Sequence, residues 1–136
     1  MFIKRIIIDG FKSYKEKVVL DGFDDSFNAI TGFNGSGKSN ILDAICFVLG
    51  LSRLDVARCQ NLRDLVYKSG KAGILSAKVT IELDNSTKIF DKPDWRHFDL
   101  ISVSRTVCLF FDRSFHSLII SLSIGNRKQS IEISNQ

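Results

Sequence analysis

Residues 32–39 read Gly32-Phe33-Asn34-Gly35-Ser36-Gly37-Lys38-Ser39. This stretch fits the pattern G-x-x-x-x-G-K-[ST], which is typical of loops that bind nucleotide phosphates. Glycines let the backbone turn tightly and bring successive N–H groups close to phosphate oxygens. In such a loop the ammonium group of Lys38 reaches the β- and γ-phosphates, and the hydroxyl group of Ser39 ligates Mg²⁺. The motif therefore predicts a phosphate-binding site, against the alternative of a surface loop that matches by chance.

The residues on either side of the loop supply the setting that the motif needs. Phe27-Asn28-Ala29-Ile30 reads as a short strand entering the loop. After the loop, Ile41, Ile45 and Leu49 recur every four residues, which is the spacing of the buried stripe of a helix. Gly50 is placed to end that helix. The helix would add its N-terminal N–H groups and the positive end of its dipole to the phosphate site.

Length and composition favour a globular protein. The chain has 136 residues, of which 44% are hydrophobic and 25% charged, and this indicates one domain or part of one. Its apolar runs are too short to span a membrane and its first residues lack a secretory signal, so we expect an intracellular protein without a membrane partner. Cys46, Cys59 and Cys108 are widely spaced, which favours reduced thiols over a metal site. The net charge of +4 is compatible with a nucleic-acid partner.

Outside the loop and its helix, the chain reads mainly as strands joined by turns. The segments expected to form strands are 2–9, 17–20, 76–84 and 101–107. Residues 10–14 read as a turn, and residues 61–67 as a short helix that Asn61 would cap. Early strands with one helix, followed by antiparallel-looking strands, predict an α/β fold with a mixed sheet.

Three segments resemble the structural maintenance of chromosomes (SMC) family. They are residues 27–50, Gly10-Phe11-Lys12-Ser13-Tyr14 and residues 61–68. Within the family they look most like the second SMC subunit, which belongs to condensin, and the match covers residues 1–107. The resemblance implies an ABC-type P-loop ATPase whose head is assembled from N- and C-terminal parts of one chain. The chain would then be an N-terminal half-head.

The resemblance also implies roles for particular residues, with ATP and Mg²⁺ as cofactors. The residues that would bind the cofactor are Gly32, Phe33, Asn34, Gly35, Ser36, Gly37, Lys38, Ser39 and Asn40, together with Lys12 and Ser13 on a turn that approaches the nucleotide in relatives. Lys38 and Arg58 would act in catalysis, since Arg58 occupies the place of an arginine that reaches the phosphates in this family. The alternatives are a solvated surface charge for Arg58 and an exposed loop for Lys12 and Ser13.

The parts that complete ATP hydrolysis in the family are missing from this sequence. They are a Gln loop, an apolar strand ending in Asp-Glu, and a Ser-Gly-Gly signature. Ile6-Ile7-Ile8-Asp9 resembles the apolar strand only superficially, because Gly10 follows it instead of Glu. No coiled-coil heptads are present either. We therefore expect ATPase activity from the complete head and none from this chain alone.

The end of the chain departs from the family pattern. Relatives continue from the strand at residues 101–107 into a glycine-rich hairpin, whereas residues 108–123 here are rich in Phe, Leu, Ile and Ser. We interpret residues 1–107 as the head part and 108–136 as a divergent tail, with the hypothesis that the tail is aberrant or alternatively spliced. Its apolar segments would promote aggregation if they were exposed to solvent.

Three interpretations of the function stay open at this point. The resemblance implies an ATP-binding half-head that acts in mitotic chromosome condensation, in the nucleus and on chromosomes. Its partners would be the C-terminal half of the head, the other SMC subunit, the non-SMC condensin subunits and DNA of any sequence. The alternatives are a truncated nucleotide-binding fragment without turnover and a DNA-repair ATPase of the same branch, which Asn34 marks. The basic residues that would face DNA, or merely solvent, are Lys4, Arg5, Lys12, Lys15 and Lys17.

Overall fold

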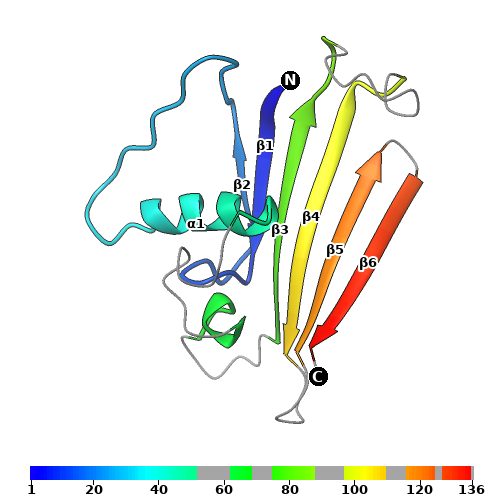
Figure 1. Cartoon of the computed structure of the whole chain (residues 1–136). Helices are drawn as coiled ribbons and strands as arrows, with labels where there is room; N and C mark the ends of the chain where they lie inside the picture. Colours follow the sequence, from blue (N-terminus) through cyan, green and yellow to red (C-terminus); the bar gives the residue numbers. More distant parts are fainter. Residues whose placement is uncertain (52–61, 69–74, 88–96, 110–115, 125–126, 136) are drawn as a thin grey trace.

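The chain forms one antiparallel sheet with a helix across one face (Figure 1). The computed structural model describes residues 1–51, 62–68, 75–87, 97–109, 116–124 and 127–135, and for 116–135 it describes the backbone only. The sheet order is β2-β1-β3-β4-β5-β6, and every pairing among these strands is antiparallel. The elements are β1 (Phe2–Asp9), β2 (Val18–Asp21), α1 (Lys38–Val48), η1 (Leu62–Leu65), β3 (Ser76–Asp84), β4 (Leu100–Leu109), β5 (His116–Ile124) and β6 (Arg127–Asn135). The predicted α/β class is confirmed, but the predicted mixed sheet is wrong for the described strands, because all their pairings are antiparallel.

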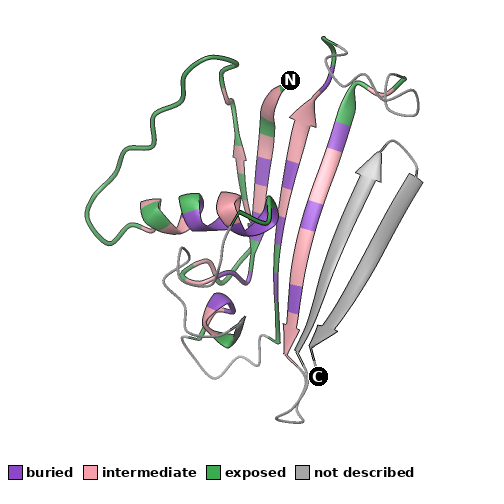
Figure 2. Ribbon diagram, in the orientation of Figure 1, coloured by how far each residue is buried: buried purple, intermediate pink, exposed green. Residues whose placement is uncertain are grey.

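The alternation of residue types in β1 and β3 builds the core. Ile6 and Ile8 of β1 pair with Ile81 and Val79 of β3, and all four side chains are fully buried beneath α1. Lys78 alternates with these residues and is exposed, as a strand with one covered face requires. Figure 2 shows the resulting bands of buried residues along β1, β3 and β4. The predicted strands at 2–9, 17–20, 76–84 and 101–107 are confirmed to within a few residues.

Helix α1 packs on the sheet with a face that differs from the predicted one. Its buried apolar residues are Ile41, Ala44, Phe47 and Val48. Leu49, predicted to lie in the buried stripe, is 44% exposed because the helix ends at Val48 and Leu49 is the C-cap. Gly50 follows with φ of 70°, a left-handed conformation that favours glycine, so the predicted end of the helix is confirmed.

Arg105 of β4 ties the end of α1 to the sheet. Its Nη1 donates to the carbonyl oxygen of Phe47 at 2.8 Å, and its guanidinium lies 4.8 Å from the centre of the Phe47 ring. A cation at the C-terminal end of a helix complements the helix dipole. Burial lowers the pKa of Arg105 from its ordinary value, but the group keeps its charge because arginine titrates far above neutral pH.

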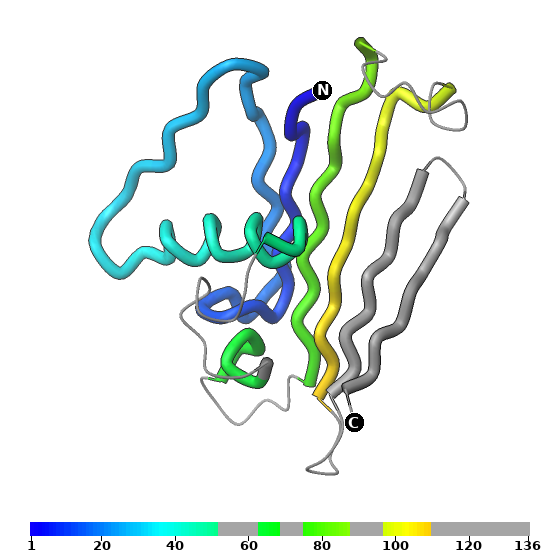
Figure 3. The backbone as a smooth tube through the Cα atoms, in the orientation of Figure 1, coloured from blue at the N-terminus to red at the C-terminus, as the bar shows by residue number. Residues whose placement is uncertain are grey.

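The strand predicted at residues 27–30 does not form. The chain leaves the sheet after β2 and returns at α1 through a long excursion that carries this segment (Figures 1 and 3). Phe27 is 78% exposed. A strand needs a hydrogen-bonding neighbour, and none of the described strands pairs with residues 27–30. The sequence pattern therefore indicated a strand for which the described part of this chain supplies no partner.

A turn centred on Asp24 begins this excursion. The Asp24 carboxylate accepts hydrogen bonds from the hydroxyl of Ser26 at 2.6 Å, from its backbone N–H at 2.9 Å, and from the N–H of Phe27 at 3.2 Å. Asn28 closes the turn by accepting from the Asp24 N–H at 2.7 Å and donating to its carbonyl at 2.8 Å. The bonds from Ser26 and then Phe27 hold the pKa of Asp24 at about 2.

We expect this carboxyl group to titrate at about pH 2 in an NMR titration of the folded chain. Because the pKa is lowered, the turn's contribution to stability is complete above the unfolded pKa of about 4 and is lost as the pH falls through about 2. Ser26→Ala removes the hydroxyl hydrogen bond, which is the largest cause of the lowered pKa, and should raise the pKa of Asp24 toward its usual value. If Asp24 titrates with the same midpoint in Ser26→Ala as in the parent chain, the hydroxyl hydrogen bond of Ser26 is not the cause of its lowered pKa.

The remaining predictions concern η1 and the C-terminal segment. The short helix predicted at residues 61–67 is confirmed as a 3₁₀ helix over residues 62–65, and Asn61, its predicted cap, lies outside the described residues. Strands β5 and β6 extend the sheet beyond β4, with Ile101 opposite Ile124 and Leu109 opposite His116. That residues 108–136 are a divergent or aberrant tail stays a prediction. No helix in the described part of the chain is long and apolar enough to cross a membrane.

Candidate nucleotide-binding site

The glycine loop ends in a shallow hollow at the beginning of α1. The hollow measures about 280 Å³ and is lined by Asn34, Gly35, Gly37, Lys38, Ser39 and Asn40. The first turn of α1 contains no acidic residue, so no carboxylate of that turn competes for its N–H groups. Positive partial charge and the Lys38 ammonium group are thus concentrated at one place, and the hollow suits an anion such as a phosphate group.

Lys38 is the first residue of α1, and its side chain folds back over the loop. Its Nζ lies 2.5 Å from the carbonyl oxygen of Gly32 and 2.5 Å from that of Phe33. The Lys38 side chain therefore links the end of the loop to its beginning at Gly32 and Phe33. Phosphate oxygens are stronger partners for an ammonium group than neutral carbonyls are. Lys38 is thus held where it can exchange these carbonyls for phosphate oxygens.

Gly37 is the N-cap of α1 and can be replaced by no other residue without strain. Its φ of 91° lies in the left-handed region. A Cβ atom at this position would lie 3.1 Å from Ser13 Oγ and 3.1 Å from Tyr14 Oη. Its carbonyl accepts hydrogen bonds from the N–H of Asn40 at 2.9 Å and of Ile41 at 3.3 Å. Both the backbone conformation and the crowding explain why position 37 requires glycine.

Gly37→Ala should weaken binding of Mg-ATP by at least about tenfold, because the added methyl group pushes against the side chains of Ser13 and Tyr14 as well as straining the backbone. Gly22→Ala is the matched control, since Gly22 has φ of 82° and nothing within 4 Å of the added atom. Fluorescence titration with a labelled ATP analogue would compare the two variants. Equal affinities for both would show that crowding at Gly37 does not matter.

The structure brings the turn at residues 10–14 against the beginning of α1. Ser13 Oγ accepts a hydrogen bond from Asn40 Nδ2 at 2.8 Å, and Lys12 Nζ lies 2.6 Å from Asp43 Oδ2. Neither Lys12 nor Ser13 lines the hollow. Direct contact of these two residues with a nucleotide therefore stays a prediction, and so does the role of Arg58, which lies outside the described residues.

Asp43 is the site residue that the sequence reasoning missed. It lies among apolar residues on the second turn of α1, and its side chain is only 11% exposed. A carboxylate that is buried needs a cationic partner, because an unpaired buried charge is strongly destabilising. That signal, an acidic residue inside a predicted apolar helix, could have indicated an ion pair but not its partner 31 residues away.

Comparison with known proteins places the chain in a family. The model of the RecF/RecN/SMC N-terminal domain matches residues 2–116. The chain belongs to the SMC family. It is 57% identical over 109 residues to structural maintenance of chromosomes protein 2 of Dictyostelium discoideum, and 55% identical over 109 residues to that of Homo sapiens. These matches cover 80% of the chain and 9% of each relative, so the chain spans about a tenth of their length.

Solved SMC heads have the same fold. An SMC head bound to the C-winged helix domain of ScpA superposes with a TM-score of 0.74 at 33% identity, over 95% of this chain and 37% of that one. A structure from work on ATP-driven dimerization of SMC ATPases gives a TM-score of 0.73 at 32% identity, over 95% of this chain and 72% of that one. The predicted family and the predicted ABC-type half-head fold are both confirmed.

Proposed function

We propose that the chain is the ATP-binding N-terminal half of a condensin-type SMC ATPase head. The observation that carries the proposal is the glycine loop at the beginning of α1, with Lys38 bridging it. Residues 32–40 would hold the phosphates, and the hydroxyl group of Ser39, a residue that lines the hollow, would hold Mg²⁺. The metal ion would neutralise charge on the phosphate oxygens. The relatives named structural maintenance of chromosomes protein 2 support the condensin assignment.

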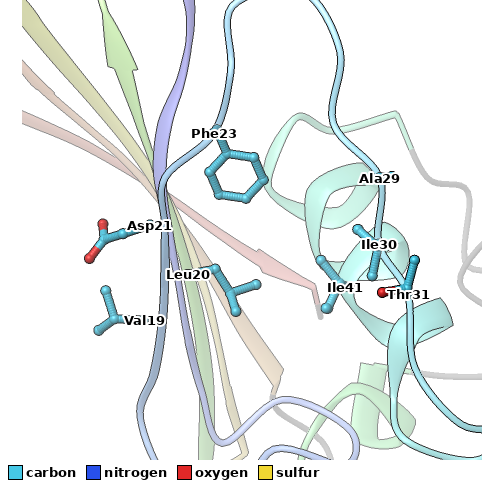
Figure 4. Close-up of a pocket in the computed structure, with 8 residues that line it drawn as sticks. All are labelled: Val19, Leu20, Asp21, Phe23, Ala29, Ile30, Thr31 and Ile41. Carbon is cyan, nitrogen blue, oxygen red and sulfur yellow. The ribbon is translucent and has the colours of Figure 1, made fainter.

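The proposal includes a second half that completes the head. A groove of about 490 Å³ lies between the edge strand β2 and the residues that lead into the loop (Figure 4). Asp21 and Thr31 line it together with six apolar residues. Its apolar lining consists of Val19, Leu20, Phe23, Ala29, Ile30 and Ile41. We assign this groove to the C-terminal half of the head, whose strands would pair with residues 27–30. The solved SMC head is more than twice as long as the part this chain matches, which supports a second half.

Turnover would require that second half. Hydrolysis needs a carboxylate near Mg²⁺ and a group that positions water, and the sequence contains neither an Asp-Glu pair nor a Ser-Gly-Gly signature. The chain alone would therefore bind nucleotide without turning it over. Lys38 and Arg58 would stabilise the charge that develops during transfer of the phosphoryl group only in the complete head.

The wider role in the proposal follows the relatives. The complete protein would act in chromosome condensation in the nucleus, with another SMC subunit, non-SMC subunits and DNA as partners. The basic N-terminal stretch supports DNA contact only weakly, because Arg5 pairs with Asp21 at 2.5 Å and Lys12 with Asp43 at 2.6 Å. Lys15 and Lys17 are exposed and are the better candidates. Binding through them should fall steeply with salt and show little base preference.

Equilibrium binding of Mg-ATP tests the nucleotide site. Lys38→Ala should lower the affinity about 100-fold, because it removes charge-assisted bonds to two phosphates. Ser39→Ala should leave binding less dependent on Mg²⁺. Lys68→Ala is the control, since Lys68 is an exposed lysine paired with Asp64 on η1, and it should bind like the parent chain. Equal affinities of the Lys38→Ala and parent chains, with or without a C-terminal head piece, would refute the site.

A further inference from the structure

Three consecutive residues of the turn after β1 contact one side of α1 in order. Tyr14 Oη donates to the carbonyl oxygen of Gly37 at 3.2 Å, Ser13 Oγ accepts from Asn40 Nδ2 at 2.8 Å, and Lys12 Nζ donates to Asp43 Oδ2 at 2.6 Å. Their partners are three residues apart, and positions at that spacing lie on one side of a helix. The turn therefore runs along the first two turns of α1, from its N-cap inward.

The turn is itself fixed to the core. The Lys12 N–H donates to the carbonyl of Leu65 at 2.8 Å, and the Tyr67 N–H donates to the carbonyl of Gly10 at 2.8 Å. Phe11 between them is fully buried and packs against Phe47 with ring centres 5.4 Å apart. The turn is thus held from its far side by η1 and the core, and it presents a fixed surface to α1.

The contact of Tyr14 bears directly on the phosphate site. In a trans peptide the carbonyl and the following N–H point in opposite directions. The Gly37 carbonyl points toward the Tyr14 hydroxyl and the N–H groups of Asn40 and Ile41. The N–H of Lys38 therefore points the other way, toward the loop. Fixing the carbonyl fixes the direction of that N–H group.

Burial makes the Lys12–Asp43 pair a strong constraint. The two side chains are 12% and 11% exposed, whereas Arg5 and Asp21, which form a surface pair, are 42% and 54% exposed. Surface pairs contribute little, but removing one member of a buried pair leaves an uncompensated charge. The pair therefore sets the position of α1 along the turn.

We propose that residues Lys12–Tyr14 are a positioning element of the phosphate site, which orients the Gly37–Lys38 peptide and the beginning of α1. The inference rests on the proposed function for its ligand. It assigns Lys12 and Ser13 an indirect role, through Asp43 and Asn40, in place of direct contact with the nucleotide. Tyr14 acts through the carbonyl of Gly37. None of the three is assigned a contact with the reacting atoms.

Tyr14→Phe tests the contact with the smallest change, since it removes only the hydroxyl group. We expect about fivefold weaker binding of Mg-ATP and faster amide hydrogen exchange at residues 38–41, with an unfolding midpoint close to that of the parent chain. Tyr67→Phe, in the segment that anchors the turn, is the matched control and should change neither readout. Unchanged exchange at residues 38–41 in Tyr14→Phe would overturn the inference.

The pair of Lys12 and Asp43 supplies a rescue experiment. Asp43→Leu alone should weaken Mg-ATP binding, and adding Lys12→Met should restore it, because the double variant replaces a buried pair by apolar groups. Loss of binding in the double variant, with slow exchange retained at residues 38–41, would show that Lys12 contacts the nucleotide directly and would overturn its indirect role. Failure of the parent chain to bind Mg-ATP would refute the proposed function, whereas the hydrogen-exchange result judges the positioning role without nucleotide.

Discussion

Replacing Phe47 with alanine is expected to lower the free energy of unfolding by about 3–5 kcal/mol. The Phe47 side chain is 2% exposed and joins α1 to both the turn and the sheet. Its ring lies 5.4 Å from that of Phe11 and 4.8 Å from the Arg105 guanidinium. The substitution would leave a cavity between Phe11 and Arg105 and remove the aromatic and cation contacts of Phe47.

Urea unfolding followed by circular dichroism measures this loss. Leu42→Ala is the matched control, because Leu42 belongs to the same helix and is 57% exposed. It should change the free energy of unfolding by less than about 1 kcal/mol. Equal destabilisation by the two substitutions would mean that the helix does not pack on the sheet through Phe47.

Ile30→Asp is expected to prevent assembly with the C-terminal half of the head. Ile30 lines the groove and is 39% exposed in this chain, so a charge there is solvated until the second half covers it. Burying an unpaired carboxylate costs several kcal/mol, which corresponds to a loss of association of about 100-fold or more. The stability of the chain alone should change little.

Association is measured by titrating the chain with a C-terminal head piece of a condensin-type relative. Leu75→Asp is the control, since Leu75 is 43% exposed and lies outside the groove. It should associate like the parent chain. If Ile30→Asp also associates normally, the groove is not the surface that the second half covers.

The strands could be predicted where the pattern and the pairing partner lie in the same chain. Residues 76–84 alternate cleanly, and the structure gives them β1 and β4 as neighbours, so pattern and fold agree. Residues 27–30 carry an equally plausible strand pattern. They stay outside the sheet because hydrogen-bonding partners decide whether a strand forms, and a local pattern contains no information on them.

The site also has features that could be predicted from the sequence and features that could not. The loop at residues 32–39 could be predicted because its glycines, lysine and serine act through the local backbone. The contacts of Tyr14 with Gly37 and of Lys12 with Asp43 join segments 23 and 31 residues apart, and they depend on how the turn after β1 packs on α1. The exposure of Leu49 has a local cause instead, since α1 ends one residue earlier than the four-residue spacing assumed.

ATP hydrolysis by the reassembled head tests most directly that this chain is half of an ATPase. The chain, a C-terminal head piece and their mixture are each supplied with Mg-ATP, and released phosphate is measured. We expect turnover in the mixture only, and its loss when the chain carries Lys38→Ala. Phosphate release by the chain alone that Lys38→Ala abolishes would contradict the half-head account.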